Sequence, residues 1–150
     1  MQGNTLNRRS PALTVTAASL VLGACTAGAY SGGNDTGLAS EPPPAPYAQV
    51  SELVELPAFI PGLGVMYVDP ETLPAGPFLG YDRGGNLSVT IYMTPLEDLE
   101  TGVAFDDLAV GDSNVETVDI YYNAGHPGVE APHAHVVLFH DEGAKERLEE

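Results

Sequence analysis

The chain has 150 residues, with 21 acidic and 5 basic side chains and a formal net charge of −16. This length predicts one folded domain beside any targeting segment. A surface this acidic repels the phosphate backbone of nucleic acids, so the composition argues against direct DNA or RNA binding. Two interpretations of the acidity stay open: adaptation to high salt, where self-repulsion is screened, or a surface that attracts cations or a basic partner.

The N-terminal residues have the pattern of an export signal. The stretch NRRSPALTVTAASLVLGAC (7–25) has a basic start, a run of uncharged small and apolar residues, and a final cysteine, which is typical of a signal peptide. The run falls short of the ~20 apolar residues that cross a membrane. Its last four residues, LGAC (22–25), resemble the lipobox of prokaryotic lipoproteins. We therefore expect a signal peptide over residues 1–24 and lipidation of Cys25, with an ordinary signal peptide and an incidental cysteine as the alternative.

The export route and the anchor follow from the same residues. Arg8 and Arg9 resemble a twin-arginine signal, but Pro11 stands where an aromatic residue or Leu is usual, so both export routes stay open. Cys25 is the single cysteine of the chain, which excludes an intrachain disulfide and leaves no other thiol for catalysis or metal binding. Stable anchoring requires more than one acyl chain on this cysteine. The expected location is the outer face of the cell membrane, or the periplasm, with the membrane met through the N-terminal lipid.

A linker is expected between the lipid and the folded domain. Residues 25–46 are rich in Gly, Ser, Ala and Pro and lack apolar periodicity, so they bury too little surface to offset their chain entropy. We interpret them as a lipid-anchored flexible linker, stiffened near its end by PPPAP (42–46). The globular domain is expected over residues 47–150.

Strand signals begin the globular domain. GLGVMYVDP (62–70) predicts a short apolar strand that ends at Asp69-Pro70. GPFLGYD (76–82) and NLSVTIYMT (86–94) flank the glycine-rich turn Arg83-Gly84-Gly85. Two apolar runs around such a turn predict a β-hairpin.

A helix signal follows the hairpin. Thr94, Pro95 and Glu97 stand at the spacing of a capping box with proline at the first helical position. The pattern predicts a short helix over residues 95–100 that ends near Gly102.

The C-terminal third predicts two further strands and a helix. The strands are ETVDIYYN (116–123) and PHAHVVLFH (132–140), and Asp141 is placed to cap a short helix over residues 142–150. Strands joined mostly by short connections, with a few small helices, indicate an α+β fold with a mainly antiparallel sheet in a single small domain.

All four histidines fall in the segment YYNAGHPGVEAPHAHVVLFH (121–140). Because side chains alternate along a strand, His133 and His135 share one face with Val137 and Phe139, while His140 lies on the other. Two imidazoles side by side on one face are a bidentate start for a divalent metal ion.

The third ligand must come from outside the strand. His126, in the loop NAGHPG (123–128), is the nearest candidate, and Glu130 or Asp119 could add a carboxylate. The predicted site is therefore one divalent metal ion on His126, His133 and His135. Two alternatives stay open. The histidines serve structural roles in a turn and a strand, or they carry metal-free acid–base chemistry.

No established catalytic signature is present. The chain has no GxSxG, P-loop or Rossmann glycine set. YDRGGN (81–86) is interpreted as a hairpin tip rather than a phosphate cradle. Whether the protein is an enzyme is left open.

Three stretches carry a resemblance to a known family. GLGVMYVDPETLPAGP (62–77), IYM (91–93) and VDIYYNAGHPGVEAPHAHVVLF (118–139) resemble, in this order, segments of the uncharacterised domain family that includes a sigma-E-regulated protein of Thermus. The resemblance covers most of residues 55–143. It implies a compact α+β domain with the capacity to self-associate, and no established activity.

The family's polar set is partly replaced in this chain. The resemblance places Met66 where the family has a His, Ile91 where it has a Glu, and Val137 where it has the last His. His135 stands at an Asp position, while His126 and His133 keep the family's histidines. Either a smaller, more apolar site remains on His126, His133 and His135, or the fold is kept without the function.

Two functions are compatible with these patterns. The first is an exported, lipid-anchored acidic domain that acts as a binding or structural component at the cell surface, as a homo-oligomer. The alternative is a divalent-metal-binding protein or metalloenzyme built on the histidine cluster.

Overall fold

The computed structural model describes residues 37–111 and 114–150, and the predicted signal peptide (1–24) and Cys25 lie outside them. The elements in chain order are β1 (Ala48–Gln49), α1 (Val50–Leu53), β2 (Val65–Val68), η1 (Pro70–Thr72), β3 (Phe78–Tyr81), β4 (Leu87–Pro95), α2 (Leu96–Glu100), β5 (Thr117–Asn123), β6 (His133–Phe139) and α3 (Ala144–Glu149).

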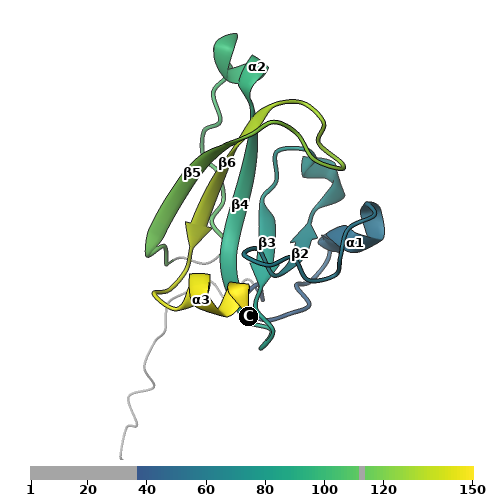
Figure 1. Ribbon diagram of the computed structural model, residues 1–150, viewed down its shortest axis with the longest axis vertical. Coiled ribbons are helices and arrows are strands. Elements are labelled where there is room, and N and C mark those ends of the chain that lie inside the picture. The colour runs from purple at the N-terminus through teal and green to yellow at the C-terminus, as the bar shows by residue number, and fades with distance from the viewer. Residues whose placement is uncertain (1–36, 112–113) are drawn as a thin grey trace, which may run out of the picture. The chain divides into compact units, whose positions relative to one another are not determined.

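The strands form one antiparallel sheet in the order β1-β2-β3-β4-β6-β5. Figure 1 shows β6 between β4 and β5, with β5 at the edge of the sheet. The predicted α+β fold with a mainly antiparallel sheet is confirmed. The five predicted strands, β2 to β6, and the β3–β4 hairpin are also present, and each of these strands lies within its predicted range or extends it by one residue. The two-residue strand β1 was not predicted.

The inner face of the sheet carries the larger core. Alternation along β6 buries residues 133, 135, 137 and 139 and leaves the residues between them half-buried, as period-two patterning requires. The cluster on this face also receives Ala144 and Leu148 of α3, both fully buried. The buried members are Met66, Val68, Phe78, Val89, Ile91, Met93, Val137, Phe139, Ala144 and Leu148.

The outer face carries a smaller core over β2, β3 and β4. Tyr67, Leu79, Tyr81 and Leu87 pack there against partly buried Leu38 and two further side chains. This core ends before β5, which leaves the outer face of the β5–β6 pair open among the described residues.

Residues 37–46, the end of the expected linker, pack on the outer face. The amide of Glu41 donates to the carbonyl of Gly85 at 2.9 Å, and the Tyr81 hydroxyl donates to the carbonyl of Leu38 at 2.9 Å. Pro43 is buried. The packed part of the chain therefore starts before the predicted boundary at residue 47, because Leu38 and Pro43 add apolar contacts that the composition of the segment does not reveal.

The helix after β4 forms without the predicted capping box. Thr94 belongs to β4 and pairs with Ala134 on β6, and its hydroxyl donates to the Ala134 carbonyl at 3.2 Å. Pro95 occupies the cap position, with no side-chain hydrogen bond to the helix. Strand pairing takes the Thr94 hydroxyl away from the helix end, so the predicted helix is present and its predicted cap is wrong. None of the helices in the described ranges has the length and apolar character to cross a bilayer.

A buried carboxylate joins the β3–β4 turn to α3. Asp82 is 2% exposed, accepts from the amides of Gly84 at 2.9 Å and Asn86 at 3.0 Å, and receives Arg147 Nε at 2.6 Å. Burial by itself would raise the pKa of Asp82, but the Asn86 amide, the Arg147 guanidinium and the other donors lower it below its ordinary value. Arg147 also binds Asp141, whose carboxylate accepts from the Gly143 amide before α3.

We expect the Asp82→Ala substitution to lower the free energy of unfolding by about 3 kcal/mol, because it removes the buried carboxylate that accepts from the Gly84 and Asn86 amides and pairs with Arg147. Asp141→Ala is the matched control, since this carboxylate also binds Arg147 but its side chain is 46% exposed, and we expect a loss of about 1 kcal/mol. Urea unfolding of both variants measures the difference, and equal losses would contradict the central role of Asp82.

Candidate metal centre

Strand pairing places two histidines on the inner face of the sheet. His135 pairs with Met93 of β4 on one side and with Tyr121 of β5 on the other. His133 lies two residues earlier on the same face, and the exposed fractions of His133 and His135 are 0% and 5%. This confirms the predicted shared face for His133 and His135, and both side chains are buried.

His126 reaches the same place from the loop between β5 and β6. The His126 and Val129 backbones exchange two hydrogen bonds of 2.9 and 3.0 Å around Pro127-Gly128. Gly128 has φ of +90°, so proline followed by a left-handed glycine gives the pattern of a type II turn. Gly128 lies against Val54, the residue that follows α1, since a Cβ on Gly128 would stand 3.1 Å from its Cγ1. In Figure 1 the loop arches from β5 and β6 toward the side of β2 and α1.

Gly125 controls the approach to this turn. Its φ is +124°, and a Cβ would lie 2.3 Å from the carbonyl oxygen of Glu130. Its amide donates to the Asn123 side chain at 2.8 Å. The loop therefore closes on itself just before His126, which fixes where that imidazole begins.

The three predicted ligands form one cluster. One ring nitrogen from each of His126, His133 and His135 lies within 4.8 Å of the others. The rings of His133 and His135 are stacked with centroids 4.9 Å apart, and the ring of His126 meets both edge-on at 4.9 and 5.5 Å. The structure thus brings together the three residues that the sequence selected.

Hydrogen bonds determine which ring nitrogen of His126 and of His133 carries the proton and which keeps a lone pair. His133 Nδ1 lies 2.7 Å from the carbonyl oxygen of Ala131, and His126 Nδ1 lies 3.0 Å from that of Pro127. A carbonyl only accepts, so each Nδ1 carries the proton and each Nε2 keeps a lone pair. Orientation of metal-binding histidines by such backbone carbonyls is usual.

His135 links these rings to a tyrosine. Its Nε2 lies 2.9 Å from Nε2 of His133, and its Nδ1 lies 3.2 Å from the hydroxyl of Tyr121. Because Nε2 of His133 is bare, Nε2 of His135 must donate in this contact, and Nδ1 then accepts from Tyr121. In the other tautomer, Nδ1–H would donate to the Tyr121 oxygen and three bare Nε2 atoms would converge.

The environment favours the neutral forms of His135 and Tyr121. Burial, together with the nearby rings of His133 and His126, lowers the pKa of His135 to about 4. Burial and the Asp119 carboxylate raise the pKa of Tyr121. A neutral imidazole is the form that binds metal, so His135 stays competent over the physiological range.

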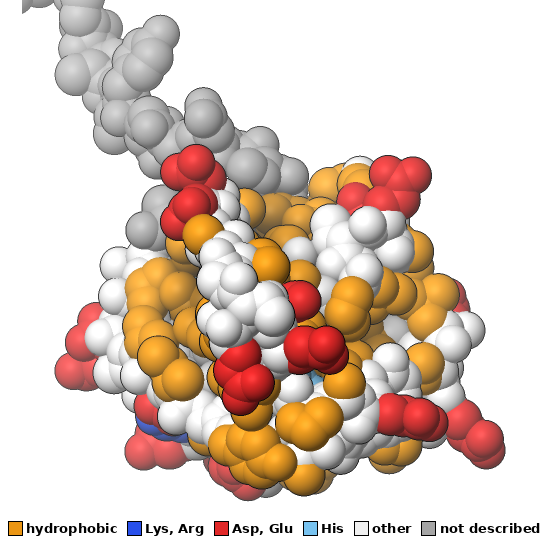
Figure 2. Space-filling view, turned by 90° about the horizontal axis from the view of Figure 1, so that it is seen from above, with side chains coloured by type: hydrophobic (Ala, Val, Ile, Leu, Met, Phe, Trp, Pro, Cys, Tyr) orange, Lys and Arg blue, Asp and Glu red, His pale blue; other side chains and the backbone are white. Residues whose placement is uncertain are grey.

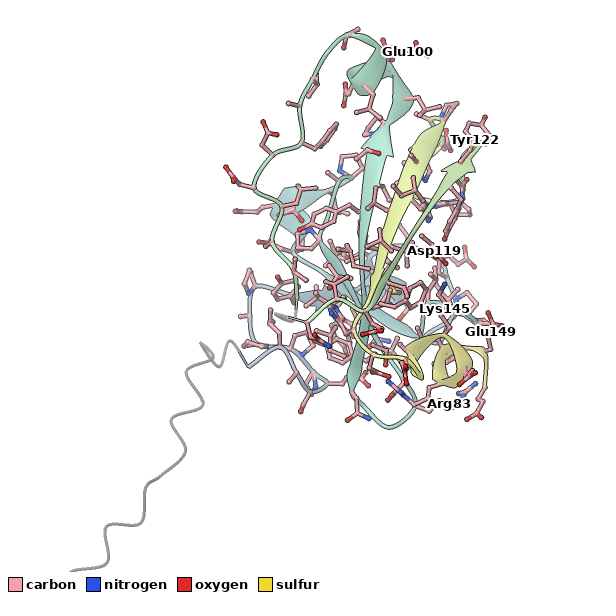
Figure 3. The ribbon with its side chains drawn as sticks, turned by 90° about the vertical axis from the view of Figure 1, so that its left-hand side faces the viewer. Arg83, Glu100, Asp119, Tyr122, Lys145 and Glu149 are labelled. Carbon is pink, nitrogen blue, oxygen red and sulfur yellow. The ribbon has the colours of Figure 1, made fainter. Side chains whose placement is uncertain are left out.

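The remaining sequence candidates lie elsewhere. Asp119 forms an ion pair of 2.7 Å with Lys145, which Figure 3 shows beside it near α3. Glu130 is outside the three-histidine cluster. His140 is buried on the outer side, where Nε2 meets the Thr90 hydroxyl at 2.8 Å and Nδ1 donates to the Asn114 carbonyl. Its role is structural, and it lies on the face opposite His133 and His135, as predicted.

An apolar cavity of about 350 Å³ opens beside the cluster, and sequence patterns gave no sign of it. His126, His135, Tyr121 and Asn123 form its polar part, all from the β5–β6 hairpin and its loop. The apolar part comes from α1, the loops after α1 and β2, the inner face of the sheet and the β5–β6 loop. The residues of this apolar part are Val50, Leu53, Val54, Leu56, Ile60, Leu63, Met66, Val68, Leu73, Pro74, Phe78, Ile91, Met93, Pro127, Gly128 and Val129.

Comparison with known proteins places the chain in a family. Its structure is similar to the crystal structure of the hypothetical protein TTHB210 from Thermus thermophilus, with a TM-score of 0.56 and 41% sequence identity. The match covers 63% of this chain and 94% of the Thermus chain. The chain belongs to the family of this Thermus protein. No protein-family model and no curated protein matches it.

Membership of an uncharacterised family with a Thermus member is thereby confirmed, and the positions that the resemblance singled out can be located in the structure. Met66 and Ile91 line the cavity together with His126 and His135. Val137 lies in the core and is 1% exposed.

In the metal-free protein, we expect the free energy of unfolding to fall as pH decreases from about 6.5 toward 4. The unfolded His135 gains a proton near pH 6.5, whereas the folded ring resists it until about pH 4, so protons favour the unfolded chain in this window. Histidine ¹⁵N shifts measured alongside urea unfolding separate this ring from the carboxylates. A His135 ring that titrates near pH 6.5 in the folded protein would contradict the expectation.

Proposed function

We propose that this chain is a transition-metal-binding protein whose ion is held by Nε2 of His126, His133 and His135. The observation that carries the proposal is the cluster of three ring nitrogens within 4.8 Å, two of them with Nδ1 engaged by a backbone carbonyl. Imidazole ligands suit zinc, copper, iron and nickel. Three protein ligands leave a fourth position open, and His126 and His135 border the cavity from which that position would be reached.

The cluster needs only a small adjustment to hold an ion. Tetrahedral zinc with Zn–N bonds of 2.0–2.1 Å separates ligand nitrogens by roughly 3.3 Å. The contact between His133 and His135 would widen from 2.9 Å, and His126 would close from within 4.8 Å. His126 sits on a half-buried loop, so the ligand that must move most is the one least restrained by the sheet.

We expect Zn²⁺ to bind with one equivalent per chain. At a free concentration of 100 times Kd it should stabilise the fold by about 2.7 kcal/mol, which corresponds to a Tm increase of roughly 10–20 °C for a domain of this size. His126→Ala should abolish this increase with little effect on the metal-free fold, because the residue lies on a loop. Glu130→Gln is the control and should bind Zn²⁺ normally.

Calorimetric titration and thermal melts with and without chelator measure the effect. Histidine ¹⁵N spectra add a specific signature, since Zn²⁺ binding should move the proton of His135 from Nε2 to Nδ1, where Tyr121 accepts it. A melting temperature unmoved by Zn²⁺ and by chelator would reject the metal site.

Self-association is a second candidate property, favoured by the exposed side of the edge strand. Val118, Ile120 and Tyr122 of β5 are 50%, 70% and 63% exposed, and Figure 3 shows Tyr122 toward the end of that strand. The half-buried Val136 and Leu138 of β6 extend this apolar surface. A patch of this kind on an acidic protein is typical of an interface, and a homo-oligomer would cover it.

Replacing Ile120 with Asp should therefore shift the protein toward monomer, while Leu99→Asp on α2, 46% exposed, should leave the oligomer intact. Sedimentation velocity measures both. A wild-type chain that stays monomeric at every concentration up to its solubility limit would reject self-association.

We also propose that the chain is exported and anchored to the outer face of the membrane through lipid on Cys25, with the predicted signal peptide (1–24) removed. The support is the sequence Leu22-Gly23-Ala24-Cys25 after an uncharged run with a basic start. The wild type should fractionate with membranes and yield an acylated N-terminal peptide by mass spectrometry, and Cys25→Ser should be released. Wild-type protein with a free Cys25 thiol would reject the anchor.

A further inference from the structure

We propose that the cavity binds a medium-chain aliphatic monocarboxylic acid, with its tail among the apolar side chains and its carboxylate on the metal ion held by the three histidines. This rests on the proposed metal site and names the ligand that would occupy its open position.

The cavity has two chemically different parts. Its polar groups all belong to the β5–β6 hairpin and its loop, whereas α1, β2, β3 and β4 contribute apolar side chains such as Leu53, Met66 and Phe78. A ligand that satisfies both parts has one polar end and one aliphatic end, with the polar end at the histidines. Binding sites of this type combine an apolar lining with a few convergent polar groups.

The charge of the metal ion determines the polar end of the proposed ligand. Among the described residues that line the cavity there is no Lys, Arg, Asp or Glu. Three neutral imidazoles leave a divalent ion with its full double charge in an apolar surrounding, where an uncompensated charge is costly. A carboxylate supplies negative charge and an oxygen donor at once. An aliphatic amine would instead add a positive charge beside the ion.

The volume of the cavity determines the length of the aliphatic chain. A volume of about 350 Å³ holds about a dozen non-hydrogen atoms at the ~30 Å³ that a water molecule occupies in the liquid. Octanoate and decanoate fall within this range. Each methylene group moved from water into the cavity should strengthen binding about fourfold, until the cavity is full.

The test uses the full chain with Cys25→Ser, which removes the lipid and changes none of the described residues. Hexanoate, octanoate, decanoate and tetradecanoate are titrated calorimetrically with and without one equivalent of Zn²⁺, and Zn²⁺ binding itself is measured separately. We expect affinity to rise about fourfold per methylene up to decanoate, to level off before tetradecanoate, and to fall at least tenfold without Zn²⁺. Methyl decanoate, which keeps the chain and lacks the carboxylate, should bind at least tenfold more weakly. This also separates a free acid from the esterified chains of membrane lipid.

Three variants separate the two halves of the proposal. His126→Gln should lose both Zn²⁺ and decanoate. Leu53→Trp places a bulky indole ring at the exposed rim of the cavity and should weaken decanoate binding at least tenfold while Zn²⁺ binds normally. Leu99→Trp on α2 lies outside the cavity, is similarly exposed, and should bind both normally.

Each other outcome has a defined meaning. Normal Zn²⁺ binding without decanoate binding would overturn this inference and leave the metal site standing. Decanoate binding that is equal with and without Zn²⁺, or unchanged in Leu53→Trp, would overturn the proposed pose. Failure of Zn²⁺ to bind would overturn the metal site and, with it, this inference.

Discussion

The pairing of β6 between β4 and β5 is the constraint on which the core and the histidine cluster both depend. Each residue from 133 to 139 has a partner on both neighbouring strands, so the register of β6 is held from two sides. Val137 and Phe139 are buried in the inner core, and the period of two then carries His135 and His133 to the same face. A slip of one residue would turn both imidazoles outward and expose the core residues. Apolar burial therefore positions the polar site.

This dependence explains which features were predictable. The hairpin around residues 83–85 and the face shared by His133 and His135 follow from local alternation and turn chemistry, and both are confirmed. The cap at Thr94 failed because a tertiary contact, its hydroxyl bond to Ala134, competes with a local motif. The packing of residues 37–46 also depends on partners more than 40 positions away along the chain, such as Tyr81 with Leu38. Local patterns contain no information about such partners.

The cavity illustrates a stronger limit. Its lining comes from α1, the loops after α1 and β2, the five strands β2 to β6 and the loop that carries His126, so no single segment contains its signature. The sequence did indicate that Met66 and Ile91 replace polar residues of the family, and both positions line the cavity. The resemblance therefore implies fewer hydrogen-bonding groups and more apolar surface at that end of the cavity, whose other end carries His126 and His135. The imidazoles of the cluster are oriented by backbone carbonyls and one tyrosine hydroxyl.

The charge distribution separates the surface from the site. Figure 2 shows Asp and Glu side chains spread over the face it presents, with Lys and Arg scarcely visible, and the chain carries a net charge of −16. The cluster and the cavity lining contain neutral donors among the described residues. Surface carboxylates attract cations only over the Debye length, ~10 Å at 0.1 M salt, whereas imidazole nitrogens bind through directed lone pairs that salt does not screen. An acidic surface of this kind can raise the local cation concentration at low salt and keep the domain soluble at high salt. The positions of His133 and His135 in the cluster are set in both cases by the register of β6.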